Sequence, residues 1–494
     1  MTTRLEFSLR RPTRGQLWRV GGGVALLLAT SAGSSVATAS TSKGPLKPST
    51  IFFTPQPAAA ALSQVQQLTQ AGNPTAANAI LHMLQVPQAV WFTGSSNGAP
   101  DSPASIQYQV SATIADASSL GQLPILVAFN IPGNECSTTS LGGATTTAAF
   151  ETWINAFAQG LGQSKALVLL NPDSLAMLPS SCYNYNSGNN PDFPYTDQER
   201  IQETQYAVNA LSADTNAYVY LDGGNSAWQS VGVIAARLVQ ANVGQTRGFF
   251  LNVSNHQFSA NNVAYGNWLS SCIYYATSIA PGNYNNCPSQ FNAPQARNTY
   301  NQLSPYGAWS ASAKNPFYNI TRMNLAYAAL LGGASPKAHF VIDTSRNGAG
   351  ENPMTTYAAA PYNQPAIVNS TYTAANGTRV TTHRASAVIA ALQQGYSCNQ
   401  PGSKVGPLPS ANTRTLSPLL DAFLWVKNPG ASDDQCGTQE SNRAWNYAKY
   451  SGKGWPANAA TLGTFDPLWG QVDPPAGSWF PAAALMYALS MPRG

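Results

Sequence analysis

The segment that decides the fold is Ala166-Leu167-Val168-Leu169-Leu170-Asn171-Pro172-Asp173. Apolar residues in a row, without polar alternation, are typical of a strand that is buried on both faces, as in a parallel sheet. The run ends in a polar turn whose last residue is an acid. The segment therefore predicts a buried parallel strand that carries an acidic side chain at its carboxyl end.

The same pattern recurs along the chain. Short apolar runs that end in polar residues occur at 125–130, 217–222, 248–252, 339–343 and 421–427. Apolar residues at helical spacing lie at 149–157, 199–211, 228–243 and 323–331. Alternating strands and helices over this length predict a β/α barrel, whose chemistry lies at the carboxyl ends of the strands. Those ends carry acids and amides with few cations, which favours a sugar-binding cleft over a phosphate site.

The chain is poor in charge. Charged residues make up 9% of its 494 residues, against about 25% in an average globular protein. The net charge of +5 comes mostly from residues 1–39, which hold five arginines and one glutamate, so the remainder has 20 basic and 19 acidic side chains. No cluster of basic and aromatic residues remains, so nucleic acid is not expected as a partner. A surface of neutral polar side chains suits neutral polar substrates such as sugars.

The N-terminus has the pattern of an export signal. Arginines precede an apolar run at 23–29, and the small residues Ala37-Thr38-Ala39 follow it. The run is shorter than the roughly 20 residues of a membrane-spanning helix, although an uncleaved anchor is the alternative. Residues 40–60 are rich in Ser, Thr, Pro and Ala, which is typical of a linker. We predict a signal peptide over 1–39, a linker over 40–60 and one large domain over 61–494, secreted and without a membrane partner.

The cysteines indicate an oxidising compartment. Six cysteines in an exported chain are expected to form disulfides, in one of fifteen connectivities. We predict pairing between neighbours in the sequence: Cys136–Cys182, Cys272–Cys287 and Cys398–Cys436. No spacing of Cys and His is typical of a zinc site, so neither a metal nor another cofactor is expected. A monomer is the simplest expectation.

Asp173 has two interpretations from the residues alone. At the end of a very apolar strand, partial burial would raise the pKa of Asp173 toward the value that a proton donor needs. Asp also favours the first position of a helix, so Asp173 could instead cap the helix that follows.

Five segments in order carry a family resemblance. They are LLNPDSLA at 169–176, YLDGGNSAW at 220–228, FFLNVSN at 249–255, IDTSRNG at 342–348 and DAFLWVKNPGASD at 421–433. They resemble E-P-D-S-L-A, Y-L-D-A-G-H-x-x-W, N-V-S-N, I-D-T-S-R-N-G and D-A-F-L-W-V-K-P-P-G-E-S-D of glycoside hydrolase family six, the cellobiohydrolases and endoglucanases. The resemblance covers about residues 85–485.

The resemblance implies a distorted, incompletely closed β/α (TIM-like) barrel whose catalytic domain spans 61–494. It implies an inverting β-1,4-glucan hydrolase, in which one carboxyl group protonates the leaving oxygen and another activates water. Asp173 is then the proton donor and Asp433 the base, although Asp433 could instead be a solvated loop carboxylate beside Asp434. In FNIPGNEC at 129–136, Glu135 stands where the family has an Asp that tunes the pKa of the acid and steadies the cationic transition state.

The same resemblance assigns the sugar contacts. Apolar faces of sugar rings stack on indoles, and hydroxyl groups need amide and charged partners. The substrate-binding residues implied are Trp91, Asp222, Asn225, Trp228, Asn255, Arg346 and Lys427. Trp425 lies in a strand interior and is expected in the core.

Several residues depart from the family pattern. Phe129 replaces a Tyr, Asn130 an Asp, Asn171 a Glu, Asn225 a His, Ala431 a Glu that binds the reacting sugar, and Ser397 a Trp platform. Because several of these changes remove charge, a degenerate member that binds glucan without cutting it is the alternative. Segments 257–315 and 349–396 leave room for a tunnel, which slightly favours exo action (a cellobiohydrolase), while the missing platform at 397 argues against a processive grip.

A serine esterase is a further alternative. The segment Gly94-Ser95-Ser96-Asn97-Gly98 matches G-x-S-x-G. A nucleophile elbow needs a helix directly after the serine, and Ala99-Pro100-Asp101-Ser102-Pro103 has the composition of a loop. The pattern therefore does not predict an esterase.

Overall fold

The computed structural model describes residues 44, 46–96, 99–136, 143–182, 189, 193–213, 216–353, 355–356, 369–373, 379–383, 398–434, 436, 465–466, 469 and 471–492. The predicted signal peptide lies outside these ranges. Within them, no helix combines the length and the apolar character that crossing a membrane requires.

A parallel sheet of seven strands forms the centre of the fold. Its order is β1-β4-β5-β6-β7-β10-β13, and every neighbouring pair is parallel. The strands are β1 (Val90–Phe92), β4 (Ile125–Ala128), β5 (Ala166–Leu170), β6 (Ala217–Asp222), β7 (Gly248–Leu251), β10 (His339–Asp343) and β13 (Leu420–Leu424). The six predicted strands are confirmed, and the structure adds β1.

Apolar packing covers both faces of the sheet. All five residues of β5 are buried. Val168 and Leu170 join the outer cluster that packs under the helices, whereas Leu167 and Leu169 join a second cluster inside the curled sheet. Burial on both faces explains why the strands lack polar alternation.

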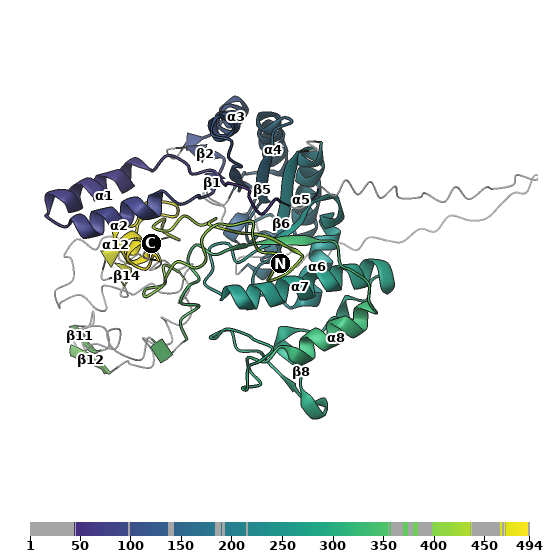
Figure 1. The fold of residues 1–494 in the computed structure, drawn as a ribbon. Coiled ribbons are helices and arrows are strands. Elements are labelled where there is room, and N and C mark those ends of the chain that lie inside the picture. The colour runs from purple at the N-terminus through teal and green to yellow at the C-terminus, as the bar shows by residue number, and fades with distance from the viewer. Residues whose placement is uncertain are drawn as a thin grey trace, which may run out of the picture. The chain divides into compact units, whose positions relative to one another are not determined.

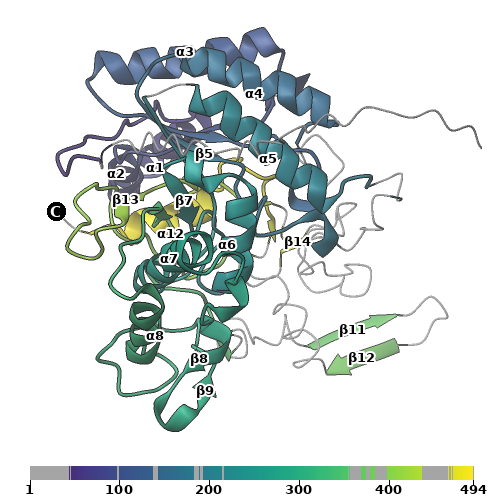
Figure 2. The same ribbon diagram turned by 90° about the vertical axis from the view of Figure 1, so that its right-hand side faces the viewer.

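Helices connect successive strands on the outside. They are α3 (Pro103–Ser119), α4 (Thr147–Leu161), α5 (Asp197–Ser212), α6 (Val231–Gln240), α7 (Ser259–Tyr274) and α8 (Thr321–Leu331). Helices α3, α4 and α5 lie side by side (Figures 1 and 2). Helix α5 starts with a capping box, in which Thr196 and Glu199 satisfy each other's backbone N–H groups. The predicted helices in α4, α5, α6 and α8 are confirmed.

The barrel is incompletely closed, as the resemblance implies. Among the described residues, no ladder joins the edge strands β1 and β13. The contact there consists of the N–H of Ala89, which donates to the Trp425 carbonyl at 2.9 Å, and the indole of Trp91, which donates to the Val426 carbonyl at 2.8 Å. The sheet is therefore a curled half-barrel with a seam.

Three further helices pack together beside this seam. Helices α1 (Ala59–Gln70), α2 (Pro74–Leu84) and α12 (Pro481–Leu489) share a third apolar cluster (Figure 1). Trp425 is part of this cluster and is 0% exposed, so its expected place in the core is confirmed.

The segment predicted as a linker also contributes to the core. Leu46, Phe52 and Phe53 are buried, and Phe52 forms a bridge with Leu123. Its two phenylalanines explain the difference, because their apolar area favours packing over solvation. The described part of residues 40–60 therefore belongs to the folded unit.

Two-stranded pieces complete the described structure. They are β2 (Ser95–Ser96) with β3 (Ala99–Pro100), β8 (Ala293–Pro294) with β9 (Tyr300–Asn301), β11 (Asn369–Thr373) with β12 (Arg379–His383), and β14 (Phe465–Asp466) with β15 (Gln471–Val472). Segment 257–315 contains α7, β8 and β9, while most of 349–396 lies outside the described residues.

The three disulfides have the predicted pairing. Cys136 bonds Cys182, Cys272 bonds Cys287, and Cys398 bonds Cys436. The first and third join loops at the carboxyl ends of the strands, so they fix the backbone that surrounds the candidate site.

Candidate active site

A strained turn presents Asp173. Strand β5 ends at Leu170, and both Asn171 (φ 47°) and Asp173 (φ 66°) adopt the left-handed backbone conformation. Such angles are uncommon outside glycine and cluster at functional sites. The Oδ1 of Asn171 accepts the N–H groups of Asn130 (3.0 Å) and Ile131 (3.3 Å) from the neighbouring loop. Asp173 therefore stands on a hydrogen-bonded turn and does not begin a helix, since the next helical turn, η3 (Pro179–Ser181), starts at Pro179 and the next α-helix, α5, starts at Asp197.

Asp222 stabilises this turn by accepting hydrogen bonds from its backbone. Its Oδ2 accepts the N–H groups of Leu175 (3.0 Å) and Ala176 (2.7 Å), and its Oδ1 accepts that of Gly224 (2.9 Å). The residue is 1% exposed, and burial raises its pKa against the lowering effect of these backbone bonds. Asp222 is not among the residues that line the cavity described below, and its carboxylate bonds the backbone of the turn; the substrate contact that the resemblance implies for it stays a prediction.

Two arginines hold the same turn from the helices. Arg200 on α5 is 2% exposed and donates to the carbonyls of Ser174 (3.1 Å) and Pro132 (2.7 Å). Arg237 on α6 donates to the carbonyls of Leu175 (2.8 Å) and Ala176 (2.9 Å). Both helices thus fix the backbone that carries Asp173.

One cavity gathers most of the predicted site. It has a volume of about 420 Å³ and is lined by Asp173, Asn225, Ala227, Trp228, Ser254, Asn255, Gln257, Glu351, Cys398, Lys427 and Asp433. Apart from Cys398, these residues follow the carboxyl ends of β5, β6, β7, β10 and β13. In a parallel sheet those ends meet at one edge, which is where β/α folds bind ligands.

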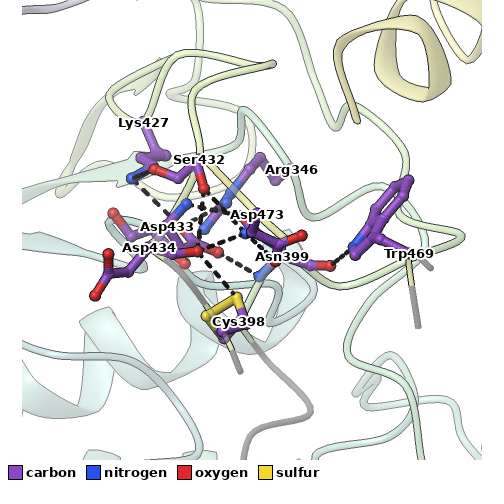
Figure 3. Close-up of a disulfide and its surroundings, with 11 residues drawn as sticks. Arg346, Cys398, Asn399, Lys427, Ser432, Asp433, Asp434, Trp469 and Asp473 are labelled. Atoms are coloured by element: carbon purple, nitrogen blue, oxygen red, sulfur yellow. Dashed lines mark hydrogen bonds and ion pairs between the residues drawn. A yellow bond between two sulfur atoms is a disulfide. The ribbon is translucent and has the colours of Figure 1, made fainter. Parts of the chain in front are cut away.

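Asp433 lies in a cationic pocket (Figure 3). Its Oδ1 is 2.7 Å from the Arg346 guanidinium and 3.4 Å from the Lys427 ammonium, and its Oδ2 accepts the Asn399 N–H at 2.7 Å. Burial alone would raise the pKa of Asp433, but Arg346 and Lys427 outweigh it and hold the pKa well below its usual value. Asp433 is therefore an anion across the working pH range, and not a free surface carboxylate.

The remaining predicted residues lie around the cavity. Arg346 is 1% exposed and reaches the cavity through Asp433. The indole ring of Trp91 packs edge-on against Phe129 at 5.3 Å and does not line the cavity. The backbone of Glu135 lies in the short helix η1 (Asn134–Cys136), and its side chain is outside what the structure describes.

The structure adds residues that the motifs do not reveal. Gln257 and Glu351 line the cavity, and Asn399 exchanges two backbone–side-chain hydrogen bonds with Asp433 at 2.7 Å. His256 is 1% exposed beside Arg346 and Asp433, and burial together with Arg346 lowers its pKa to about 3. A neutral imidazole therefore lies next to the ion pair of Arg346 and Asp433. The only sequence signal for Gln257, His256 and Glu351 is their closeness to the motifs at 249–255 and 342–348, and the only one for Asn399 is its place next to Cys398.

Two other interpretations can be placed on the structure. Ser96 ends β2, which pairs with β3 in an antiparallel hairpin, so this serine has no strand-to-helix elbow. Among the described residues, no group of three or more His, Cys, Asp or Glu side chains could hold a metal ion.

Comparison with known proteins identifies related chains. The family model for glycosyl hydrolases family 6 matches residues 47–490. Endoglucanase 1 of Streptomyces halstedii is 28% identical over 359 residues, which cover 72% of this chain and 74% of that protein. Probable 1,4-β-D-glucan cellobiohydrolase C of Aspergillus fumigatus is 26% identical over 372 residues, which cover 72% of this chain and 59% of that protein.

Solved structures share the fold. An endoglucanase from Mycobacterium tuberculosis, in complex with methyl-cellobiosyl-4-deoxy-4-thio-β-D-cellobioside, superposes with a TM-score of 0.52 at 24% identity. That match covers 92% of this chain and 99% of the endoglucanase chain.

Proposed function

Because this chain belongs to glycosyl hydrolases family 6 and is therefore a glycoside hydrolase, we propose that it is a secreted, inverting β-1,4-glucanase that cleaves cellulose or related β-glucans. Asp173 protonates the departing glycosidic oxygen, and Asp433 is the base that activates water. The observation that carries the proposal is one cavity lined by Asp173, Asp433 and Trp228 together. An acid, an anion and an indole platform are the groups that hydrolysis of a sugar chain requires.

The charge of Asp433 supports its role. Ion pairs with Arg346 and Lys427 keep Asp433 ionised, so it is ready to accept a proton, and Asp173 is presented to the same cavity on the turn with positive φ. Glu135 remains a proposed helper of Asp173, because Arg200 bonds both the Pro132 carbonyl just before it and the Ser174 carbonyl just after the acid.

Substrate contacts are proposed for the cavity residues. Trp228 stacks against a glucose ring, and Asn225, Asn255 and Lys427 bond hydroxyl groups. Trp91 remains a proposed outer platform, and exo action remains slightly favoured by the long segments 257–315 and 349–396. Secretion, with residues 1–39 as the signal, is supported by three disulfides, which persist in oxidising compartments.

A glucan-binding protein without activity is the second candidate. One observation favours this candidate. The negative charge of Asp433 is balanced by two cations, and its carboxylate also accepts the Asn399 N–H, so these interactions make the carboxylate a weak base. Binding through Trp228 would survive such a loss of chemistry.

Release of reducing sugar from amorphous cellulose separates the two candidates. We expect the purified chain to release sugar and Asp173→Asn to release at least about 100-fold less, because general acid catalysis is worth about 10²–10⁴-fold. Equal release by both proteins would remove Asp173 from the mechanism. Retention of both proteins on cellulose without any release would instead establish the binding protein.

A further inference from the structure

The cavity wall carries a third carboxylate to which the motifs assign no role. Glu351 lines the cavity together with Asp173 and Asp433, and it is 9% exposed. Its Oε2 accepts a hydrogen bond from Nε2 of Gln257, which lines the same cavity and is 2% exposed. Two buried polar side chains, from the loops after β7 and β10, therefore meet at one place in the wall.

Gln257 has an unused acceptor there. Its Oε1 is buried and accepts no hydrogen bond from any residue that the structure describes. The amide cannot be reversed to satisfy it, because its oxygen would then face the Glu351 carboxylate. Buried polar atoms normally have a partner, so this oxygen calls for a donor from within the cavity.

The backbone of Gln257 is rigidly held. Its N–H donates to Oδ1 of Asn252 at 3.1 Å. Its carbonyl accepts the side-chain amides of Asn262 (3.0 Å) and Asn347 (2.9 Å). The amide group is thus preorganised before any ligand arrives.

Gln400 holds the backbone on both sides of Glu351. Nε2 of Gln400 donates to the Gly350 carbonyl at 3.0 Å, and its Oε1 accepts the Asn352 N–H at 2.7 Å. Gly350 has φ +75°, and a Cβ at this position would lie 2.2 Å from the Phe258 ring, so only glycine fits. The backbone that carries the Glu351 side chain therefore has a fixed position in the wall.

We propose that Gln257 and Glu351 form a binding site for two hydroxyl groups of one glucose ring of the glucan. The carboxylate accepts one hydroxyl hydrogen, and Oε1 of Gln257 accepts the other. Sugar hydroxyls are donors that suit a carbonyl and a carboxylate set side by side, and the bond to the charged partner is the stronger one. This inference rests on the proposed function and adds a specificity-determining pair to it, with no part in the proton transfers.

Binding of an uncleavable ligand tests the pair apart from hydrolysis. The probe is methyl-cellobiosyl-4-deoxy-4-thio-β-D-cellobioside, titrated calorimetrically into the whole chain and into Glu351→Gln. We expect the variant to bind about 10- to 100-fold more weakly, as for loss of a hydrogen bond to a charged group. Gln257→Met, which keeps the side-chain length but removes the acceptor, should weaken binding by about 3- to 10-fold, as for a neutral hydrogen bond. Unchanged thermal melting checks that both variants fold.

Two further arms make the result specific. Asp434→Asn removes one negative charge next to Asp433 but does not line the cavity, so it should bind the probe as the parent chain does. Probes that lack a single hydroxyl are then titrated into the parent chain and into Glu351→Gln. For the probe that lacks the hydroxyl bound by Glu351, the loss of affinity from the missing hydroxyl and the loss from Glu351→Gln should not add, because each change removes the same hydrogen bond.

The outcomes separate the pair from the function. Parent-like affinity of Glu351→Gln, or strictly additive losses with every deoxy probe, would overturn the inference while leaving the glucanase in place. Failure of the parent chain to bind the probe would overturn the proposed function, and the inference with it.

Discussion

Lys427 sets the ionisation of Asp433 together with Arg346. Its ammonium lies 3.4 Å from Oδ1 and also donates to the Ser432 carbonyl at 2.8 Å. Removing this cation in Lys427→Met should raise the pKa of Asp433. Because a base must be ionised to act, the acid limb of the pH profile of kcat/KM should move to higher pH.

This shift is measured with a soluble cello-oligosaccharide from pH 3 upward. Lys427→Arg keeps the charge and serves as the matched control, with its limb close to that of the parent chain. Because Asp433 of the parent chain stays ionised throughout this range, a Lys427→Met profile with no greater loss of activity in acid than the parent profile would mean that Asp433 is not the ionising base.

Glu203 carries a pH-dependent cost of folding. It is 3% exposed on α5, Thr147 donates to its Oε1 at 2.7 Å, and burial raises its pKa to about 7. In the folded chain Glu203 is thus neutral below about pH 7, whereas in the unfolded chain it ionises near the ordinary glutamate pKa of 4.5. Its contribution to stability is fully present below the unfolded pKa and is lost as the pH rises through 7.

Glu203→Gln removes this dependence. The variant should unfold in urea with the parent chain at pH 4.5 and be the more stable of the two at pH 8, by up to about 3 kcal/mol. A difference that is the same at both pH values would show that Glu203 ionises freely in the folded chain.

Sequence patterns can predict a functional residue only where the residue lies within a continuous motif. Asp173, Trp228 and Lys427 follow strands within recognisable motifs, and the structure brings all three to one cavity. Gln257 and Glu351 are 94 positions apart, so no local pattern links them. The role of Asp222 could not be predicted either, because its partners are backbone N–H groups whose position depends on a turn with positive φ.

Among the elements, helix α6 covers the sheet and also stabilises the turn that carries Asp173. Its Arg237 holds the Leu175 and Ala176 carbonyls, and Gln229, just before the helix, donates to the same Ala176 carbonyl at 2.7 Å. Arg237→Met should release the acid turn and lower kcat on a cello-oligosaccharide by roughly 10- to 100-fold, since small misplacements of catalytic groups have effects of this size. KM should change little, because Arg237 does not line the cavity.

The control is Arg322→Met on α8, an exposed arginine on a helix away from the turn. Its kcat should match the parent chain, and Arg237→Lys should recover part of the lost activity. A loss in Arg237→Met that appears only in the melting temperature would reduce this arginine to a structural role.

The elements themselves could be predicted where burial is strong. Long apolar runs identified six of the seven strands, but β1 has three residues and is too short to stand out. Helices α1, α2 and α12 are rich in alanine, and α12 in particular is apolar with few polar residues to mark an outer face. Their packing against Trp425 depends on contact between the segments 59–84 and 481–489, which are far apart in sequence, and periodicity does not encode such a contact.

In the molecule as a whole, a charged cluster stabilises the end of the sheet opposite to the cavity. Asp421 bonds Arg247 at 2.7 and 2.8 Å, His339 at 3.0 Å and the Tyr220 hydroxyl at 2.7 Å. These residues lie in or just before β6, β7, β10 and β13. Burial raises the pKa of Asp421, but Arg247 and His339 outweigh it and lower the pKa.

Asp421→Asn should therefore affect stability and not catalysis. Breaking a buried ion pair by removing one partner costs about 3–5 kcal/mol, which urea unfolding at pH 7 would measure. The loss should shrink in acid, because the depressed pKa gives stability that is present above the unfolded value and lost as the pH falls through the folded one. An equal fall in kcat/KM at 25 °C would contradict this separation of the two ends.

The short segment Cys398-Asn399-Gln400 joins two acids that are far apart in sequence. Asn399 holds Asp433, and Gln400 clamps the backbone on both sides of Glu351. A substitution in this tripeptide thus disturbs both carboxylates in a single mutational step. Across related genes, we expect positions 351, 400 and 433 to change together or not at all. Correlated variation at these positions in an alignment would then indicate that one segment supports both acids.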